Sequence, residues 1–191
     1  MTAEEDVTEA EEERVFGKLN RLLKVVNEQK EDRGLVLTLA AFSEEALGRL
    51  IEAYLHDEKA AKSLVEGFNA PLGSFSTRIL AARALGLISE EQYSDLEKLR
   101  KIRNEFAHTW DRISLSRASM TDRVSAMTPS RVTNVDAEAS TFIKLRDSVT
   151  SLLIEVEVAA AEASEHRLPA RSRRLTGESK PRRRKPPARS K

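Results

Sequence analysis

Hydrophobic residues recur at three- and four-residue spacing along most of the chain, which is typical of amphipathic helices. The first helix is expected from about Thr8 to Gln29. Gly34 interrupts the pattern, and the broad apolar stripe after it predicts a central, well-covered helix over residues 35–55, followed by a shorter helix over residues 58–66. The apolar faces of the first two helices are Val15, Phe16, Leu19, Leu22, Leu23 and Val26, and then Leu35, Leu39, Phe42, Ala46, Leu47, Leu50, Ile51 and Tyr54.

Turn and capping signals mark the helices that follow. Residues 67–73 contain two glycines and a proline, which predicts a loop. Ser74 can cap the next helix, and Gly86 can end it because glycine readily adopts the left-handed conformation. Residues 89–92, Ser-Glu-Glu-Gln, fit a capping box for a further helix that ends near His108. The apolar members of these two helices are Phe75, Ile79, Leu80, Ala82 and Leu85, and then Tyr93, Leu96, Leu99, Ile102 and Phe106.

Residues 109–135 carry the weakest signal, since Ser, Thr and Arg are frequent there and Pro129 interrupts any helix. One or two helical turns are expected over residues 121–127, and a last long helix over residues 136–166. The core face of that helix is Phe142, Leu145, Val149, Leu152, Leu153 and Val156. The pattern therefore predicts an all-α fold, a single compact bundle of five to six helices.

Charge divides the chain into three parts. Residues 1–13 are acidic and are expected to be frayed, residues 14–166 form the helical domain, and residues 167–191 form a basic C-terminal tail. The tail holds eleven of the 32 Lys and Arg residues and one of the 31 acidic residues, which leaves 21 basic and 30 acidic residues before it. Because the tail has almost nothing apolar to bury against the entropy cost of ordering, it is expected to be disordered.

Several kinds of site are excluded by composition. The chain has no cysteine, so it has no disulfide, thiolate metal site or cysteine nucleophile. Its three histidines, His56, His108 and His166, lack the paired spacing of a zinc helix. We therefore expect no metal and no cofactor. No apolar run approaches a membrane span and the acidic start does not resemble a secretory signal, so a cytoplasmic location is expected.

One segment could carry chemistry. Arg103 and His108 are separated by four residues at the end of a predicted helix. Histidine can exchange a proton near neutral pH, and arginine can hold a phosphate and stabilise its growing charge. With Asn104 orienting the phosphate or the 2′-hydroxyl, the three residues could cleave RNA without a metal.

The alternative interpretation of this segment is structural. Five residues of helix turn about 500°, so Arg103 and His108 converge only if the helix loosens or if two subunits face each other. Arg103 could instead pair with a carboxylate such as Glu105 or Asp111, and His108 could cap the helix end.

A second candidate site lies at the start of the helix after the glycine–proline loop. Backbone amides there, together with Ser74, Ser76 and Arg78, could bind an anion. The alternative is an ordinary turn followed by a serine cap.

The basic tail is the third candidate. Arg182, Arg183, Arg184 and Lys185 could contact nucleic acid, and without aromatic residues to stack on bases such binding would be nonspecific. The alternative is a solvated tail that aids solubility.

Four segments resemble the mannitol operon repressor family, called MltR-like. They are residues 42–47, residues 71–79 (Pro-Leu-Gly-Ser-Phe-Ser-Thr-Arg-Ile), residues 84–88 and residues 93–108, which end in Arg-Asn-Glu-Phe-Ala-His. The similarity covers roughly residues 30–115 and, loosely, the last helix. It implies an all-helical fold and a role in repressing the transcription of sugar-alcohol uptake genes. We find no helix-turn-helix with a basic recognition face, so such a regulator is expected to act through an unknown protein partner.

The spacing of Arg103 and His108 also resembles the R-x4–6-H motif of HEPN domains, helical modules that include metal-independent ribonucleases and normally pair so that two motifs share a cleft. That resemblance implies Arg103, Asn104 and His108 as active-site residues of a toxin-like endoribonuclease. Three hypotheses stay open: a regulator, which we favour, a ribonuclease, and an oligomeric scaffold without an active site. A homodimer is expected under each of them.

Overall fold

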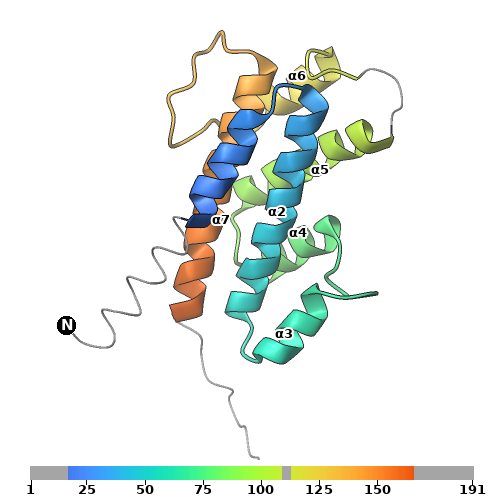
Figure 1. The fold of residues 1–191 in the computed structure, drawn as a ribbon, viewed down its shortest axis with the longest axis vertical. Helices are drawn as coiled ribbons and strands as arrows, with labels where there is room; N and C mark the ends of the chain where they lie inside the picture. Colours follow the sequence, from blue (N-terminus) through green and yellow to red (C-terminus); the bar gives the residue numbers. More distant parts are fainter. Residues whose placement is uncertain (1–16, 109–112, 166–191) are drawn as a thin grey trace, which may run out of the picture.

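Helices account for the regular structure of the part of the chain that is described, residues 17–108 and 113–165 of a computed structural model (Figure 1). This part contains no β-strand, and it confirms the expected all-α fold. Residues 17–28 are helical. The helices after them are α2 (Asp32–Tyr54), α3 (Glu58–Val65), α4 (Phe75–Ala84), α5 (Glu90–His108), α6 (Ala118–Ser125) and α7 (Thr141–Glu165). The expected frayed start and disordered tail lie outside the described residues.

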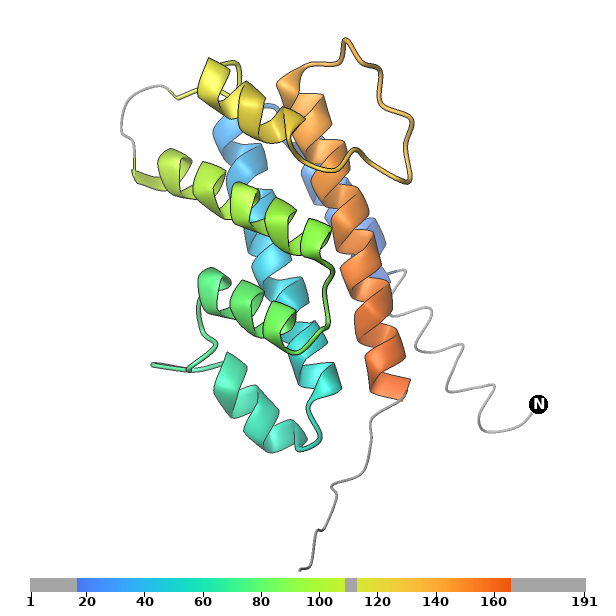
Figure 2. The same cartoon turned by 180° about the vertical axis from the view of Figure 1, so that it is seen from behind.

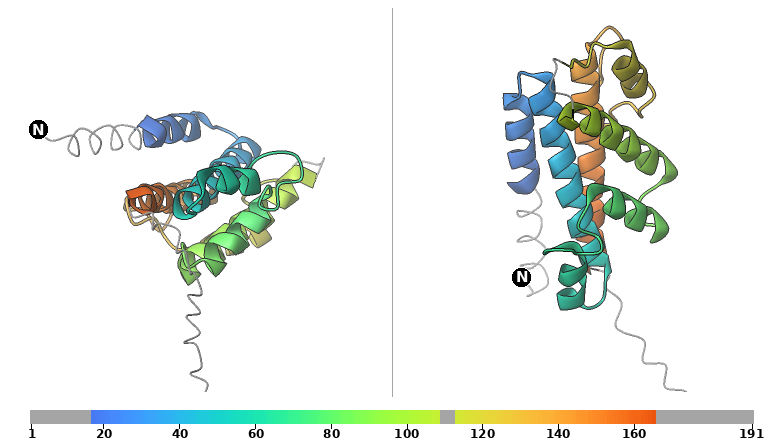
Figure 3. Two further views of the ribbon diagram at one scale, coloured as in Figure 1. Left: turned by 90° about the horizontal axis from the view of Figure 1, so that it is seen from below. Right: turned by 90° about the vertical axis from the view of Figure 1, so that its right-hand side faces the viewer.

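α2 lies at the centre of the bundle. It packs along α7, the most extensive pairing, and also contacts α3, α4 and α5, while α6 packs against α7. Residues 17–28 lie on one side of α2 and α7, and α4 and α5 cross on the other side (Figures 2 and 3). This arrangement explains the breadth of the apolar stripe on α2, because a helix with neighbours on several sides must be apolar over most of its surface.

The predicted core faces are buried in most positions. Those of α2 and α7 meet in one core, which the inner faces of α4, α5 and residues 17–28 complete. Leu80 and Leu85 are exceptions, since both are exposed although they were assigned to the apolar members of their helix. Leu23 and Tyr54 are also exposed. No helix in the described ranges is long and apolar enough to span a lipid bilayer.

Three capping predictions are confirmed. The Ser74 hydroxyl accepts a hydrogen bond from the amide of Thr77 (3.3 Å), and the Thr77 hydroxyl interacts with the Ser74 amide in return. Gly86 has φ +73°, the left-handed conformation expected after α4. Ser89 and Gln92 form a capping box. The Gln92 side-chain oxygen accepts a hydrogen bond from the Ser89 amide (2.9 Å), and the Ser89 hydroxyl accepts one from the Gln92 amide (3.1 Å).

The start of α2 was predicted three residues too late. The helix begins at Asp32, and Gly34 lies within its first turn instead of ending the preceding pattern. Asp32 also makes a tertiary contact. Its carboxylate accepts hydrogen bonds from the Ser114 hydroxyl and the Leu115 amide, both at 2.8 Å. This tertiary contact holds Ser114 and Leu115 against the start of α2.

The two C-terminal helices also differ from their predicted bounds. α6 begins at residue 118, three residues before the expected turns, and counting it as a helix brings the described helical segments to seven instead of five to six. α7 begins at Thr141 and not at Asp136, because Asp136 instead forms a turn in which its carboxylate accepts from the Glu138 amide (3.0 Å).

Gly48→Ala should destabilise the protein. A Cβ at Gly48 would lie 2.9 Å from the Arg78 guanidinium and 3.1 Å from Val65, so the added methyl group would displace the arginine. We expect a net loss of about 1–2 kcal/mol in the free energy of unfolding, since such overpacking exceeds the helix-propensity gain. Urea denaturation measures it.

Gly17→Ala is the matched control. Nothing lies within 4 Å of the position of its Cβ, so the substitution should be neutral or slightly stabilising. Equal effects of the two substitutions would contradict the close approach of α2 to Arg78.

Candidate functional site

The Arg-x4-His segment lies at the end of α5. Ile102 and Phe106 face the core, while Arg103 and Asn104 are half-buried and His108, the last residue of the helix, is exposed. The Arg103 guanidinium donates to the Asn104 side-chain oxygen at 3.1 Å. Because α5 stays helical through His108, a regular helix turns this side chain about 140° away from Arg103. One chain therefore does not bring the two side chains onto a common face.

The surroundings of this segment are ion-paired. Glu105 forms a salt bridge with Arg123 of α6, not with Arg103 as the structural alternative suggested. One turn earlier, Arg100 donates to both oxygens of Glu97, at 2.9 and 2.8 Å. That hydrogen bond lowers the pKa of the Glu97 carboxyl despite partial burial.

Arg78 has a structural role at the start of α4. Its guanidinium donates to three backbone oxygens, those of Glu44 (2.7 Å), Leu72 (2.8 Å) and Val65 (2.9 Å). It thereby joins α2, the end of α3 and the α3–α4 loop, residues 66–74. The two serines assigned to the same anion site lie apart from these bonds, because Ser74 caps α4 and its hydroxyl contacts that of Ser76 (3.1 Å).

A surface groove was not predicted from the sequence. It has a volume of about 440 Å³ and lies between residues 17–28, α2 and α7. Its apolar lining is Leu19, Leu22, Val25, Ala41, Phe42 and Leu153. Its polar lining is Lys18, Arg21, Thr38, Glu45, Arg49 and Glu157.

A buried ion pair forms one wall of the groove. Arg49 of α2 pairs with Glu157 of α7, whose side chain is 7% exposed, and also with Glu45. Burial disfavours the charge on Arg49, but the hydrogen bond from Arg49 to Glu157 and the negative charges of both glutamates outweigh it and raise the pKa of the guanidinium. The Glu45–Arg49 spacing of four residues is visible in the sequence. Glu157 is 108 residues away from Arg49, so no local pattern could have paired them.

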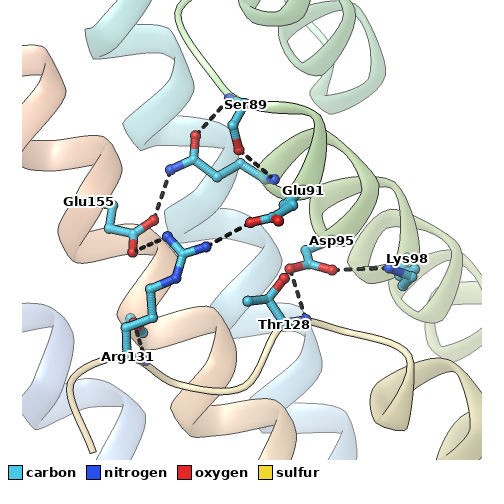
Figure 4. Close-up of polar contacts among 9 residues, drawn as sticks. Ser89, Glu91, Asp95, Lys98, Thr128, Arg131 and Glu155 are labelled. Carbon is cyan, nitrogen blue, oxygen red and sulfur yellow. Dashed lines mark hydrogen bonds and ion pairs between the residues drawn. The ribbon is translucent and has the colours of Figure 1, made fainter.

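A second polar cluster holds the segment between α6 and α7 in place (Figure 4). The Arg131 guanidinium bridges Glu91 of α5 (2.8 Å) and Glu155 of α7 (2.9 Å). The buried Asp95 carboxylate accepts from the Thr128 amide (3.0 Å) and pairs with Lys98 (3.0 Å). These bonds explain how a segment with little apolar character is ordered.

No group of acidic and histidine side chains within residues 17–108 and 113–165 could hold a metal ion. Arg182, Arg183, Arg184 and Lys185, the proposed nucleic-acid contacts, lie outside the described residues.

Comparison with known sequences shows a family match. A family model described as "Mannitol repressor" matches residues 18–160. Two curated relatives, each named "Mannitol operon repressor", come from Escherichia coli strains K12 and CFT073. Both are 32% identical to this chain over 93 residues, which are 47% of this chain and 48% of the relative. The matched region thus spans about half the length of these relatives.

A solved structure shares the fold. It is the X-ray structure of the MtlR–HPr complex from Escherichia coli, with a TM-score of 0.52 and 21% sequence identity. The match covers 76% of this chain and 98% of the other.

Arg78→Met should destabilise the protein more than a surface arginine replacement. Methionine keeps the apolar stem but leaves three backbone oxygens without the guanidinium, and hydrogen bonds from a charged donor contribute roughly 1.5–3 kcal/mol each in favourable settings. We expect a loss of about 3 kcal/mol by urea denaturation.

Arg83→Met provides the comparison, because Arg83 pairs with the exposed Glu90 at the surface and should contribute about 1 kcal/mol or less. Losses of equal size would show that the Arg78 bonds do not hold the α3–α4 loop.

Proposed function

The chain belongs to the mannitol repressor family, and from this premise we propose that it is a transcriptional regulator that represses sugar-alcohol uptake genes through contacts with another protein. The observation that carries the proposal is the family match over residues 18–160, which runs from the first described helix into α7. The Escherichia coli relatives named as mannitol operon repressors support the same role.

The arrangement of helices supports action through protein contacts. A helix-turn-helix places the N-terminal residues of its second helix against DNA bases. Among the described helices, three consecutive pairs have short connections, at residues 29–31, 55–57 and 85–89. The second helix of each pair has acidic residues in its first turn, namely Asp32, Glu58, and Glu90 with Glu91. Carboxylates at that position would repel DNA phosphates.

The related fold in the MtlR–HPr complex suggests the kind of partner. We propose that this chain likewise binds an HPr-like protein, that it works as a homodimer in the cytoplasm, and that Arg182, Arg183, Arg184 and Lys185 add a nonspecific contact to nucleic acid. At the start of α4, Ser74 and Ser76 remain a proposed anion contact, whereas the guanidinium of Arg78, the third residue of that prediction, already donates to three backbone oxygens.

A metal-independent ribonuclease using Arg103, Asn104 and His108 is the alternative. It is supported by the exposed position of His108 at a helix end. The divergence of Arg103 and His108 along α5 means that this activity would require a second chain to complete the site.

Deleting the gene should raise the transcript level of a sugar-alcohol uptake operon several-fold, because repression is lost. Wild-type protein and the His108→Ala variant should restore repression equally, since a regulator does not need the histidine. Quantitative RT-PCR measures the transcript. Unchanged transcripts from every sugar-alcohol operon would contradict the proposal.

Purified wild-type protein should not cleave a labelled single-stranded RNA pool in EDTA. The matched variant is His108→Ala, whose exposed position should leave folding intact, as thermal unfolding can verify. Cleavage by the wild type that is lost in the variant would establish the ribonuclease and make any transcriptional effect indirect.

A further inference from the structure

Phe68 is an unusual feature of the surface. It is 98% exposed, more than any other large hydrophobic side chain in the described residues. Monomeric proteins tolerate scattered apolar residues, but a large aromatic side chain held away from its own surface is typical of a binding anchor.

The backbone around Phe68 holds it in this position. Its two neighbours both have positive φ, Gly67 at +105° and Asn69 at +62°. At the base of the α3–α4 loop, the Leu72 amide donates to the Leu64 oxygen (2.8 Å), and Arg78 donates to the Leu72 oxygen. The loop is therefore tied to the bundle at its base while the aromatic ring projects from its tip.

The same chain carries a complementary surface. The groove between residues 17–28, α2 and α7 is about 440 Å³, which accommodates a benzyl side chain and its neighbours. Leu19, Phe42 and Leu153 contribute to its apolar lining. Its rim includes the exposed Arg21, whose charge is opposite to that of Glu66, which lies two residues before Phe68 and also pairs with Lys62 (3.6 Å).

The two features are placed for a reciprocal contact. In the right-hand view of Figure 3 the α3–α4 loop and residues 17–28 both lie to the left of α2, and in Figure 1 they lie on opposite sides of it, with the loop to the right and residues 17–28 to the left. Two copies facing each other across a two-fold axis can thus insert each loop into the other copy's groove, and the interface closes after two chains.

We propose that this chain forms a two-fold symmetric dimer in which Phe68 of each copy occupies the groove of the other. This contact rests on the homodimer of the proposed function but not on its regulatory role, because it depends on the loop and the groove alone. It assigns the groove to a second copy of the chain instead of a small ligand or a different protein.

The first test is the mass of the full-length protein by sedimentation equilibrium. Wild type should be dimeric, and Phe68→Ser should raise the dimer dissociation constant at least tenfold. Ala41→Arg should do the same from the other side, because Ala41 is an exposed groove residue whose replacement blocks the groove without entering the core.

Val132→Ser is the matched control. Val132 is 62% exposed, lies between α6 and α7 and belongs neither to the groove lining nor to the α3–α4 loop, so the variant should stay dimeric. A monomeric wild type, or a dimer that persists in both Phe68→Ser and Ala41→Arg, would overturn the proposal.

The second test uses the absence of cysteine from the chain. Mixing Phe68→Cys protein with Ala41→Cys protein under oxidising conditions should give a covalent dimer, whereas either protein alone should give little. A chain with both substitutions should stop at dimers, as two-fold closure requires.

Two outcomes of cross-linking would count against the contact. A ladder of higher oligomers from the doubly substituted chain would mean an open, head-to-tail contact. In a control mixture, Lys101→Cys, at an exposed position of α5, takes the place of Ala41→Cys as the partner of Phe68→Cys. Equal yields of covalent dimer from the two mixtures would mean that Phe68 does not prefer the groove.

Discussion

The fold depends on the burial of α2 among the other helices. Six large apolar residues of α2 are buried, namely Leu35, Val36, Leu39, Leu47, Leu50 and Ile51. At roughly 2 kcal/mol for each side chain, their burial contributes on the order of 10 kcal/mol, an upper estimate that is as large as the net stability of a typical domain. α7 supplies the longest facing surface, and α3, α4 and α5 are each positioned by the part of α2 that they cover.

Polar contacts determine how the connecting segments lie on this core. Arg78 ties the α3–α4 loop to α2, Asp32 binds the backbone at Leu115, and Arg131 joins the segment before α7 to α5 and α7. Arg131 and Glu91 are exposed and Glu155 is half-buried, so the bridge adds little to stability. The bridge instead fixes the position of the segment between α6 and α7, because a segment with few buried side chains would otherwise have many conformations of similar energy.

The positions of the polar residues separate structural from functional roles. Arg78 is occupied by backbone oxygens, whereas the side chains of His108 and Phe68 face solvent. A helix that stays regular through His108 separates that residue from Arg103, and this favours a regulator over a self-contained nuclease. Acidic residues at the start of α5 likewise favour protein contacts over DNA reading.

The sequence by itself determined the fold class, the order of the helices, the core faces of α2, α5 and α7, and the caps at Ser74, Gly86 and Ser89. These features follow from residues within about four positions of each other, so local spacing reveals them. Only the tertiary structure decided the start of α2 at Asp32, the role of Arg78, the Arg49–Glu157 pair and the groove. Each of these depends on residues that are distant in the chain, and local periodicity carries no information about which distant partner a charged side chain will meet.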